Sequence, residues 1–96
     1  MKKYYIKNLE NHIVNEDGIA LEEFIIFGED SVKWNKRGYY VDHRNGNTLD
    51  CRRFNLVIVD LEGIKARDNN DIEGIKNRVE FNSLDELKKS LKQHKK

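Results

Sequence analysis

The fold is decided by the stretch Arg52-Arg53-Phe54-Asn55-Leu56-Val57-Ile58-Val59-Asp60-Leu61. Residues 56–59 are all apolar, and charged residues stand at both ends of this apolar run. Because successive side chains of a strand point to opposite faces of a sheet, an unbroken apolar run predicts a strand that is buried on both faces. The rest of the chain must therefore supply a cover for each face.

Length and composition predict one domain that covers residues 1–96. Only 38% of the residues are hydrophobic and 36% are charged, which indicates a well-solvated domain with a modest core. The single cysteine, Cys51, cannot form an internal disulfide and suits a reducing cytosol. The N-terminal residues lack the apolar core of a signal peptide, and no apolar run reaches membrane-spanning length. We therefore expect a cytoplasmic protein that does not contact a membrane.

The N-terminal half predicts a series of antiparallel strands. Residues 3–8 read as a first strand, and residues 13–14 lead into a turn at Asp17-Gly18, where glycine accepts positive φ. Residues 19–27 fit either a helix or a strand. We expect a strand, because residues 24–27 are dense in aromatic and β-branched side chains. Residues 32–34 and 38–42 are expected to pair as a hairpin.

A further tight turn is predicted at Asn45-Gly46, after which the chain returns toward the opening stretch. The returning strand would begin near Thr48, and a β-bulge at Arg52-Arg53 would bring its two alternating patterns into phase. Residues 62–77 are polar and predict a long connection with one short helical turn. A last short strand is expected at residues 79–81.

The C-terminal segment predicts an amphipathic helix. Ser83 and Glu86 have the spacing of a capping box, and Leu84, Leu87 and Leu91 follow at helical spacing. This leucine stripe would pack on one face of the central strand. The expected fold class is therefore α+β, with a mostly antiparallel, twisted β-sheet (a meander of about five strands) and one C-terminal amphipathic helix packed on it.

No catalytic, metal or cofactor site is expected. Cys51 and His43 are the one plausible nucleophile–base pair. A two- or four-residue turn at Asn45-Gly46 would put them on opposite faces, and a three-residue turn would put them on one face about 7–8 Å apart, too far for a direct hydrogen bond. We therefore expect Cys51 to be a small core residue. Residues 68–74 resemble a calcium loop only superficially, and the three histidines lack ligand spacing. The protein is expected not to be an enzyme.

Charge is laid out in blocks, although the formal net charge is only +1. Residues 10–30 contain seven acidic side chains and no lysine or arginine, whereas residues 33–53 contain six basic side chains and two acidic ones. These blocks can be solvated faces that pair with one another, or they can steer charged partners. On the second interpretation, the acidic patch that would bind a partner protein consists of Glu16, Asp17, Glu22, Glu23, Glu29 and Asp30.

The function expected from these features is that of a small non-enzymatic protein-binding module. Its size and its Asn/Lys/Ile-rich composition are typical of phage or mobile-element inhibitors, which would bind a basic, nucleic-acid-handling host protein through an acidic surface. The alternative is a small nucleic-acid-binding protein that uses the basic aromatic hairpin 33–53. Large aromatic side chains are more often core residues, which weighs against that alternative. Its site would consist of Lys33, Trp34, Lys36, Arg37, Tyr39, Arg44, Arg52 and Arg53.

Overall fold

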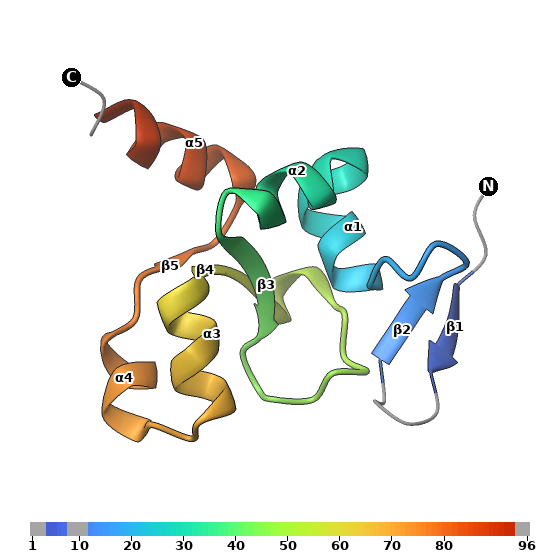
Figure 1. Cartoon of the computed structure of the whole chain (residues 1–96), viewed down its shortest axis with the longest axis horizontal. Helices are drawn as coiled ribbons and strands as arrows, with labels where there is room; N and C mark the ends of the chain where they lie inside the picture. Colours follow the sequence, from blue (N-terminus) through green and yellow to red (C-terminus); the bar gives the residue numbers. More distant parts are fainter. Residues whose placement is uncertain (1–3, 8–11, 94–96) are drawn as a thin grey trace.

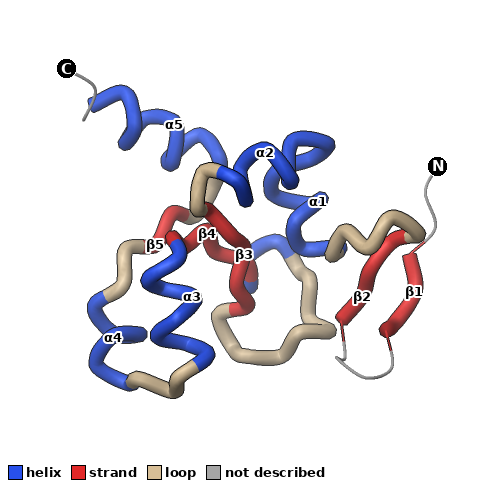
Figure 2. Tube along the Cα trace, in the orientation of Figure 1, coloured by secondary structure: helices blue, strands red, loops and turns tan. Residues whose placement is uncertain are grey.

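The computed structural model describes residues 4–7 and 12–93, which form an α+β fold with two small antiparallel sheets (Figures 1 and 2). One sheet pairs β1 (Tyr4–Lys7) with β2 (His12–Asn15). The other has the strand order β3 (Tyr39–His43), β4 (Leu56–Asp60), β5 (Glu80–Phe81). The helices are α1 (Leu21–Phe27), α2 (Ser31–Lys36), α3 (Leu61–Asp68), α4 (Ile72–Asn77) and α5 (Leu84–Gln93), with short 3-10 helices η1 (Gly28–Asp30) and η2 (Arg53–Asn55). Among the described residues, no helix is long and apolar enough to cross a bilayer.

The central strand β4 confirms the prediction made from its apolar run. Its first four side chains are at most 1% exposed, and the strand pairs antiparallel with β3 on one side and with β5 on the other. Leu56 and Ile58 belong to one core cluster, whose other buried members come from α1, α2, β3 and α5 (Ile26, Phe27, Trp34, Val41 and Leu87). One face of β4 is therefore covered by α1, α2 and α5.

The opposite face of β4 is covered by α3. A side-chain carbon added at Gly63 would lie 3.1 Å from the Val59 Cβ atom and 3.3 Å from the Arg78 Cδ atom. Glycine at this position therefore lets the helix approach the strand closely. In Figure 1, α3 and α4 lie on the side of β3 away from α1 and α2.

The described residues form five α-helices and two separate sheets where the sequence predicts a five-strand meander with one helix. Residues 19–27, expected as a strand, contain α1, and residues 32–34 lie in α2 instead of a hairpin. The buried side chains of α1 are Glu22, Ile26 and Phe27, a helical spacing and not an alternating one. Burial of this face overrides the strand preference of its aromatic and β-branched residues.

Two helices replace most of the predicted connection at residues 62–77. Each begins at an aspartate whose side chain accepts a hydrogen bond from a glycine N–H three residues later. The Asp60 carboxylate accepts from Gly63 at 2.9 Å, and the Asp71 carboxylate accepts from Gly74 at 3.0 Å. These are N-caps, which satisfy backbone donors that have no partner within the helix.

The C-terminal helix and its cap are confirmed. The Ser83 hydroxyl accepts from the Glu86 N–H at 3.2 Å, Leu87 is fully buried, and Leu84 and Leu91 pack against the core. The predicted short strand at residues 79–81 is present as β5, and the predicted first strand contains β1.

A buried ionic contact ties β3 to the layer that contains α3. The Asp42 carboxylate lies 2.8 Å from a guanidinium nitrogen of Arg67 and 2.8 Å from one of Arg78. Burial on its own would raise the Asp42 pKa, but the hydrogen bonds from the two arginines outweigh it and lower the pKa below its usual range. Asp42 is therefore buried in its charged carboxylate form, paired with Arg67 and Arg78.

Substitution Val57→Asp should abolish cooperative folding. Val57 is completely buried and lies directly opposite Asp42 on β3, so the new carboxylate would be desolvated beside a like charge, at a cost of more than about 4 kcal/mol. Val79→Asp is the matched control, because Val79 is exposed. Thermal unfolding followed by circular dichroism should show a transition for the control only. A melt of the Val57 variant close to wild type would contradict the assignment of β4 as the doubly covered strand.

Candidate functional site

The predicted acidic patch is divided between surface and interior. Four of its members, Glu16, Asp17, Glu29 and Asp30, are exposed. Glu22 is buried at 4% exposure, and Glu23 is half-buried. The burial of Glu22 removes it from any surface that a partner could contact, because the helix turns this side chain inward.

Glu23 is a structural residue that links three elements. Its carboxylate accepts a hydrogen bond from the Asn35 side-chain amide and another from the Val41 N–H, each at 2.6 Å. Val41 lies on β3, an edge strand, so this carboxylate satisfies a backbone donor that faces away from β4. Burial raises the Glu23 pKa from 4.5 to about 7 against the lowering effect of both hydrogen bonds, and the neighbouring charge of Glu22 adds to the rise.

The predicted basic aromatic hairpin is not a hairpin. Lys33 and Lys36 are exposed on α2, and Arg37 follows them with its guanidinium carbon 4.6 Å from the centre of the Trp34 ring. Trp34 is buried, stacked on Phe27 and in edge contact with the half-buried Tyr39. The interpretation of Trp34 as a core residue is confirmed, so its ring is not a platform for bases.

The three remaining basic residues lie on the β3–β4 connection, residues 44–55. A turn does form at Asn45-Gly46, where Gly46 has φ +76°. The chain does not return as a strand near Thr48 with a bulge at Arg52-Arg53, because β4 begins only at Leu56. That part of the prediction is wrong.

The buried side chain of Asn55 organises this connection. Its amide nitrogen donates to the Asn45 side-chain oxygen at 3.0 Å and to the Asp50 carbonyl at 2.8 Å. Its oxygen accepts from the Asn45 N–H at 3.1 Å. One amide group therefore makes the hydrogen bonds that a neighbouring strand would otherwise supply, and the connection is ordered without one.

We give the name arginine patch to four residues of the β3–β4 connection, Arg44, Arg52, Arg53 and Phe54. Arg44 and Arg53 both donate to Asn82, so their guanidinium groups converge at the start of α5. The Arg52 guanidinium carbon lies 4.7 Å from the centre of the Phe54 ring, and that ring is 69% exposed. Arg52 also binds the Asp50 carboxylate at 2.6 Å, and Arg44 lies 3.5 Å from Glu80. Arg53 donates to the Asn82 backbone carbonyl, and it forms no ion pair with another described residue.

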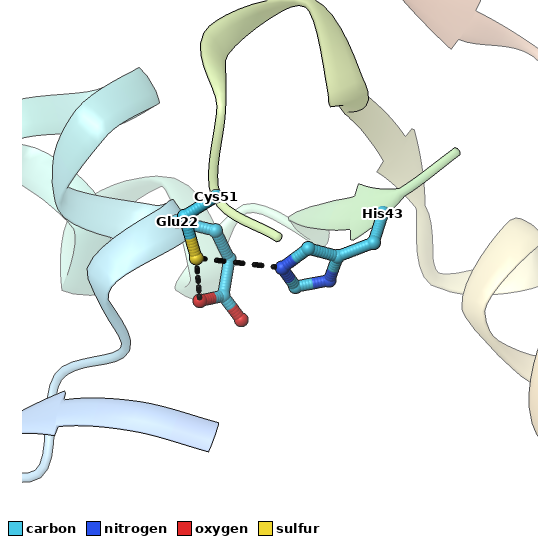
Figure 3. A group of neighbouring side chains, drawn as sticks. All are labelled: Glu22, His43 and Cys51. Carbon is cyan, nitrogen blue, oxygen red and sulfur yellow. Dashed lines mark hydrogen bonds between the residues drawn. The ribbon is translucent and has the colours of Figure 1, made fainter. Parts of the chain in front are cut away.

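Glu22, His43 and Cys51 form a compact cluster that the sequence did not predict (Figure 3). The Cys51 sulfur lies 3.7 Å from His43 Nε2 and 4.0 Å from a Glu22 carboxylate oxygen. The predicted separation of Cys51 from His43 was wrong because residues 44–55 form a folded loop and not a tight hairpin. Glu22 was missed because its segment was expected to be a strand.

The cluster does not have the properties of a thiol nucleophile. Burial raises the pKa of the Cys51 thiol to about 11, and the carboxylates of Glu22 and Asp50 contribute to the rise. The thiol is therefore protonated at neutral pH, whereas a reactive cysteine needs a lowered pKa. What the cluster does offer is a sulfur, a nitrogen and an oxygen, all within 4.8 Å of one another. These are the atom types that bind divalent transition metals.

Comparison with known proteins assigns no family to the chain. No protein-family model matches it, and no match is found among curated proteins or solved structures. A function has to be derived from the residues of this chain alone.

The Glu23 pKa predicts how stability depends on pH. Between about pH 4.5 and about pH 7, native Glu23 keeps a proton that the unfolded chain has lost, so the free energy of unfolding should fall as pH rises through this window. Glu23→Gln cannot lose a proton and should lack this fall, which amounts to at most about 3 kcal/mol. Urea unfolding of both proteins across the window measures the difference. Parallel pH profiles would show that Glu23 has an ordinary pKa.

Proposed function

We propose that the protein binds single-stranded nucleic acid through the arginine patch. The observation that carries this proposal is the Phe54 ring, 69% exposed with the Arg52 guanidinium against it. A ring exposed to this degree gains little from the protein core, but it can stack on a base, because every base has a flat π face. The aromatic side chain in this role is Phe54 and not Trp34.

The charges around Phe54 support the same function. Arg44 and Arg53 converge on Asn82, and Arg52 lies over the ring. Guanidinium groups bind phosphate oxygens in a bidentate manner and stack on aromatic faces. A single strand presents unstacked bases together with phosphates, so one ligand can satisfy the ring and the arginines at once.

The proposal predicts that Phe54→Ala weakens binding by about 1–3 kcal/mol, the usual cost of losing one stacked base. Ile72→Ala is the matched control, because Ile72 is 76% exposed on α4 and lies outside the patch. Arg53→Ala should also lower the dependence of the affinity on salt, by about 0.7 in the logarithmic slope for one phosphate contact. Fluorescence anisotropy with a labelled single-stranded oligonucleotide over a series of salt concentrations measures both effects. Equal affinity of the wild type and the Phe54 variant would contradict the proposal.

Protein binding through an acidic surface is the second candidate. A cavity of about 750 Å³ lies beside α1, with Tyr4 and Phe24 contributing apolar surface and Glu16 and Glu29 contributing carboxylates. Its complement is a lysine- or arginine-rich segment of a partner protein that also carries an apolar side chain. The inhibitor role expected from the composition belongs to this candidate, although the buried Glu22 takes no part in it.

The second candidate predicts that Glu16→Lys with Glu29→Lys abolishes binding of a synthetic peptide that alternates lysine and leucine. The reversed charges would repel the peptide at the border of the cavity. Glu62→Lys with Glu73→Lys makes the same change in net charge at exposed positions on α3 and α4 and should bind as the wild type does. Isothermal titration calorimetry compares the three proteins. Equal loss in both double variants would mean that only net charge matters.

A further inference from the structure

The Glu22–His43–Cys51 cluster is assembled from three separate elements. Glu22 comes from α1, His43 is the last residue of β3, and Cys51 lies on the β3–β4 connection. Figure 3 shows the three functional groups facing one another. Glu22 and His43 are only 4% and 3% exposed, so burial restricts the positions of both side chains.

We propose that Glu22, His43 and Cys51 bind one divalent transition-metal ion of the zinc class. Zinc bonds of about 2.3 Å to sulfur and about 2.0–2.2 Å to nitrogen and oxygen place tetrahedral ligand atoms about 3.5 Å apart. The sulfur lies 3.7 Å from the imidazole nitrogen and 4.0 Å from the carboxylate oxygen. Shifts of a few tenths of an ångström would bring both sulfur pairs to metal-binding distance. The imidazole nitrogen and the carboxylate oxygen lie within 4.8 Å of each other, and a side-chain rotation of Glu22 would close the remaining gap on binding.

The mixture of ligand atoms indicates the class of metal. Magnesium and calcium prefer oxygen ligands, whereas a thiolate together with an imidazole suits zinc and its neighbours in the first transition series. Three protein ligands leave a fourth position for water, as in zinc sites that are open to a further ligand.

Charge also favours a cation at this position. The cluster contains the Glu22 carboxylate, and the Asp50 carboxylate is close enough to act on the Cys51 thiol. On binding, the metal–sulfur bond replaces the thiol S–H bond, and the released proton passes to solvent. The ion would compensate the negative charge that the Glu22 carboxylate and the Cys51 thiolate bring together, whereas the Asp50 charge is already paired with Arg52.

A bound ion would join the β3–β4 connection to α1 and to the end of β3. This connection also carries the arginine patch, so the ion would restrict the motion of the loop on which those residues lie. Metal binding is nevertheless independent of the proposed nucleic-acid function, because its ligands are different residues and its test contains no nucleic acid.

The test is a titration of the 96-residue chain with Co²⁺, followed by competition with Zn²⁺. We expect one Co²⁺ per chain, with the near-ultraviolet charge-transfer band of a thiolate–cobalt bond, and displacement of that band by Zn²⁺. Cys51→Ser should abolish the band. Glu22→Gln and His43→Gln should each weaken Co²⁺ binding at least about tenfold. Substituting a residue that only hydrogen-bonds to a metal ligand already lowers metal affinity by about that factor, and these two residues are ligands themselves.

The matched control is His12→Gln with His94→Gln, which removes the other two imidazoles of the chain and keeps the three ligands. This variant should bind Co²⁺ as the wild type does. Circular dichroism checks the fold of each variant. If His43→Gln does not fold, the Co²⁺ affinity of Glu22→Gln is the measurement that tests the proposal. Absence of the thiolate band in wild type, unchanged affinity in Glu22→Gln, or loss of binding in the control would each overturn the proposal.

Discussion

The burial of β4 on both faces is the constraint on which the rest of the structure depends. A strand with no solvent-facing side needs two independent covers, and a chain of 96 residues has few residues with which to build them. The helices α1, α2 and α5 provide one cover, and α3, approaching closely at Gly63, provides the other. This demand explains why a small, highly charged chain devotes so much of its length to short helices.

β3 packs against β4 and also makes polar contacts with several other elements. Its consecutive residues, and Arg44 directly after it, each contact a different part of the chain. The Val41 N–H is bound by Glu23 from α1, and the Asp42 carboxylate is held by arginines from α3 and from the segment before β5. His43 then meets Cys51, and Arg44 meets Asn82. Backbone groups on the outer edge of β3 are also engaged: the Val41 N–H by Glu23, the Tyr39 carbonyl by Asn35 and the His43 carbonyl by the Gly46 N–H, which leaves fewer of them free for pairing with another chain. The same contacts fix the starting point of the β3–β4 connection.

The sequence predicted those elements whose signals are local. The apolar run of β4 and the Ser83 cap of α5 are visible in a few adjacent residues, and both were confirmed. The helical state of residues 21–27 was missed because it depends on a core that those residues meet only in the fold. Trp34, by contrast, was correctly interpreted as buried, because large aromatic side chains usually are. The meeting of Cys51 with His43 was not foreseen, because it depends on hydrogen bonds made by Asn55 at the far end of the connection.

The hydrogen bonds around Asn45 bear on its deamidation. An asparagine followed by glycine is prone to deamidate, since its side-chain carbonyl carbon can be attacked by the next backbone nitrogen to give a succinimide. Here the Asn45 side-chain oxygen accepts from the Asn47 N–H and from Asn55, and its nitrogen donates to Asp50. The attacking nitrogen, that of Gly46, donates its hydrogen to the His43 carbonyl at 3.0 Å, so ring closure would have to break this bond and rotate the Asn45 amide away from Asp50. The hydrogen bonds that shape the loop should therefore slow deamidation at Asn45.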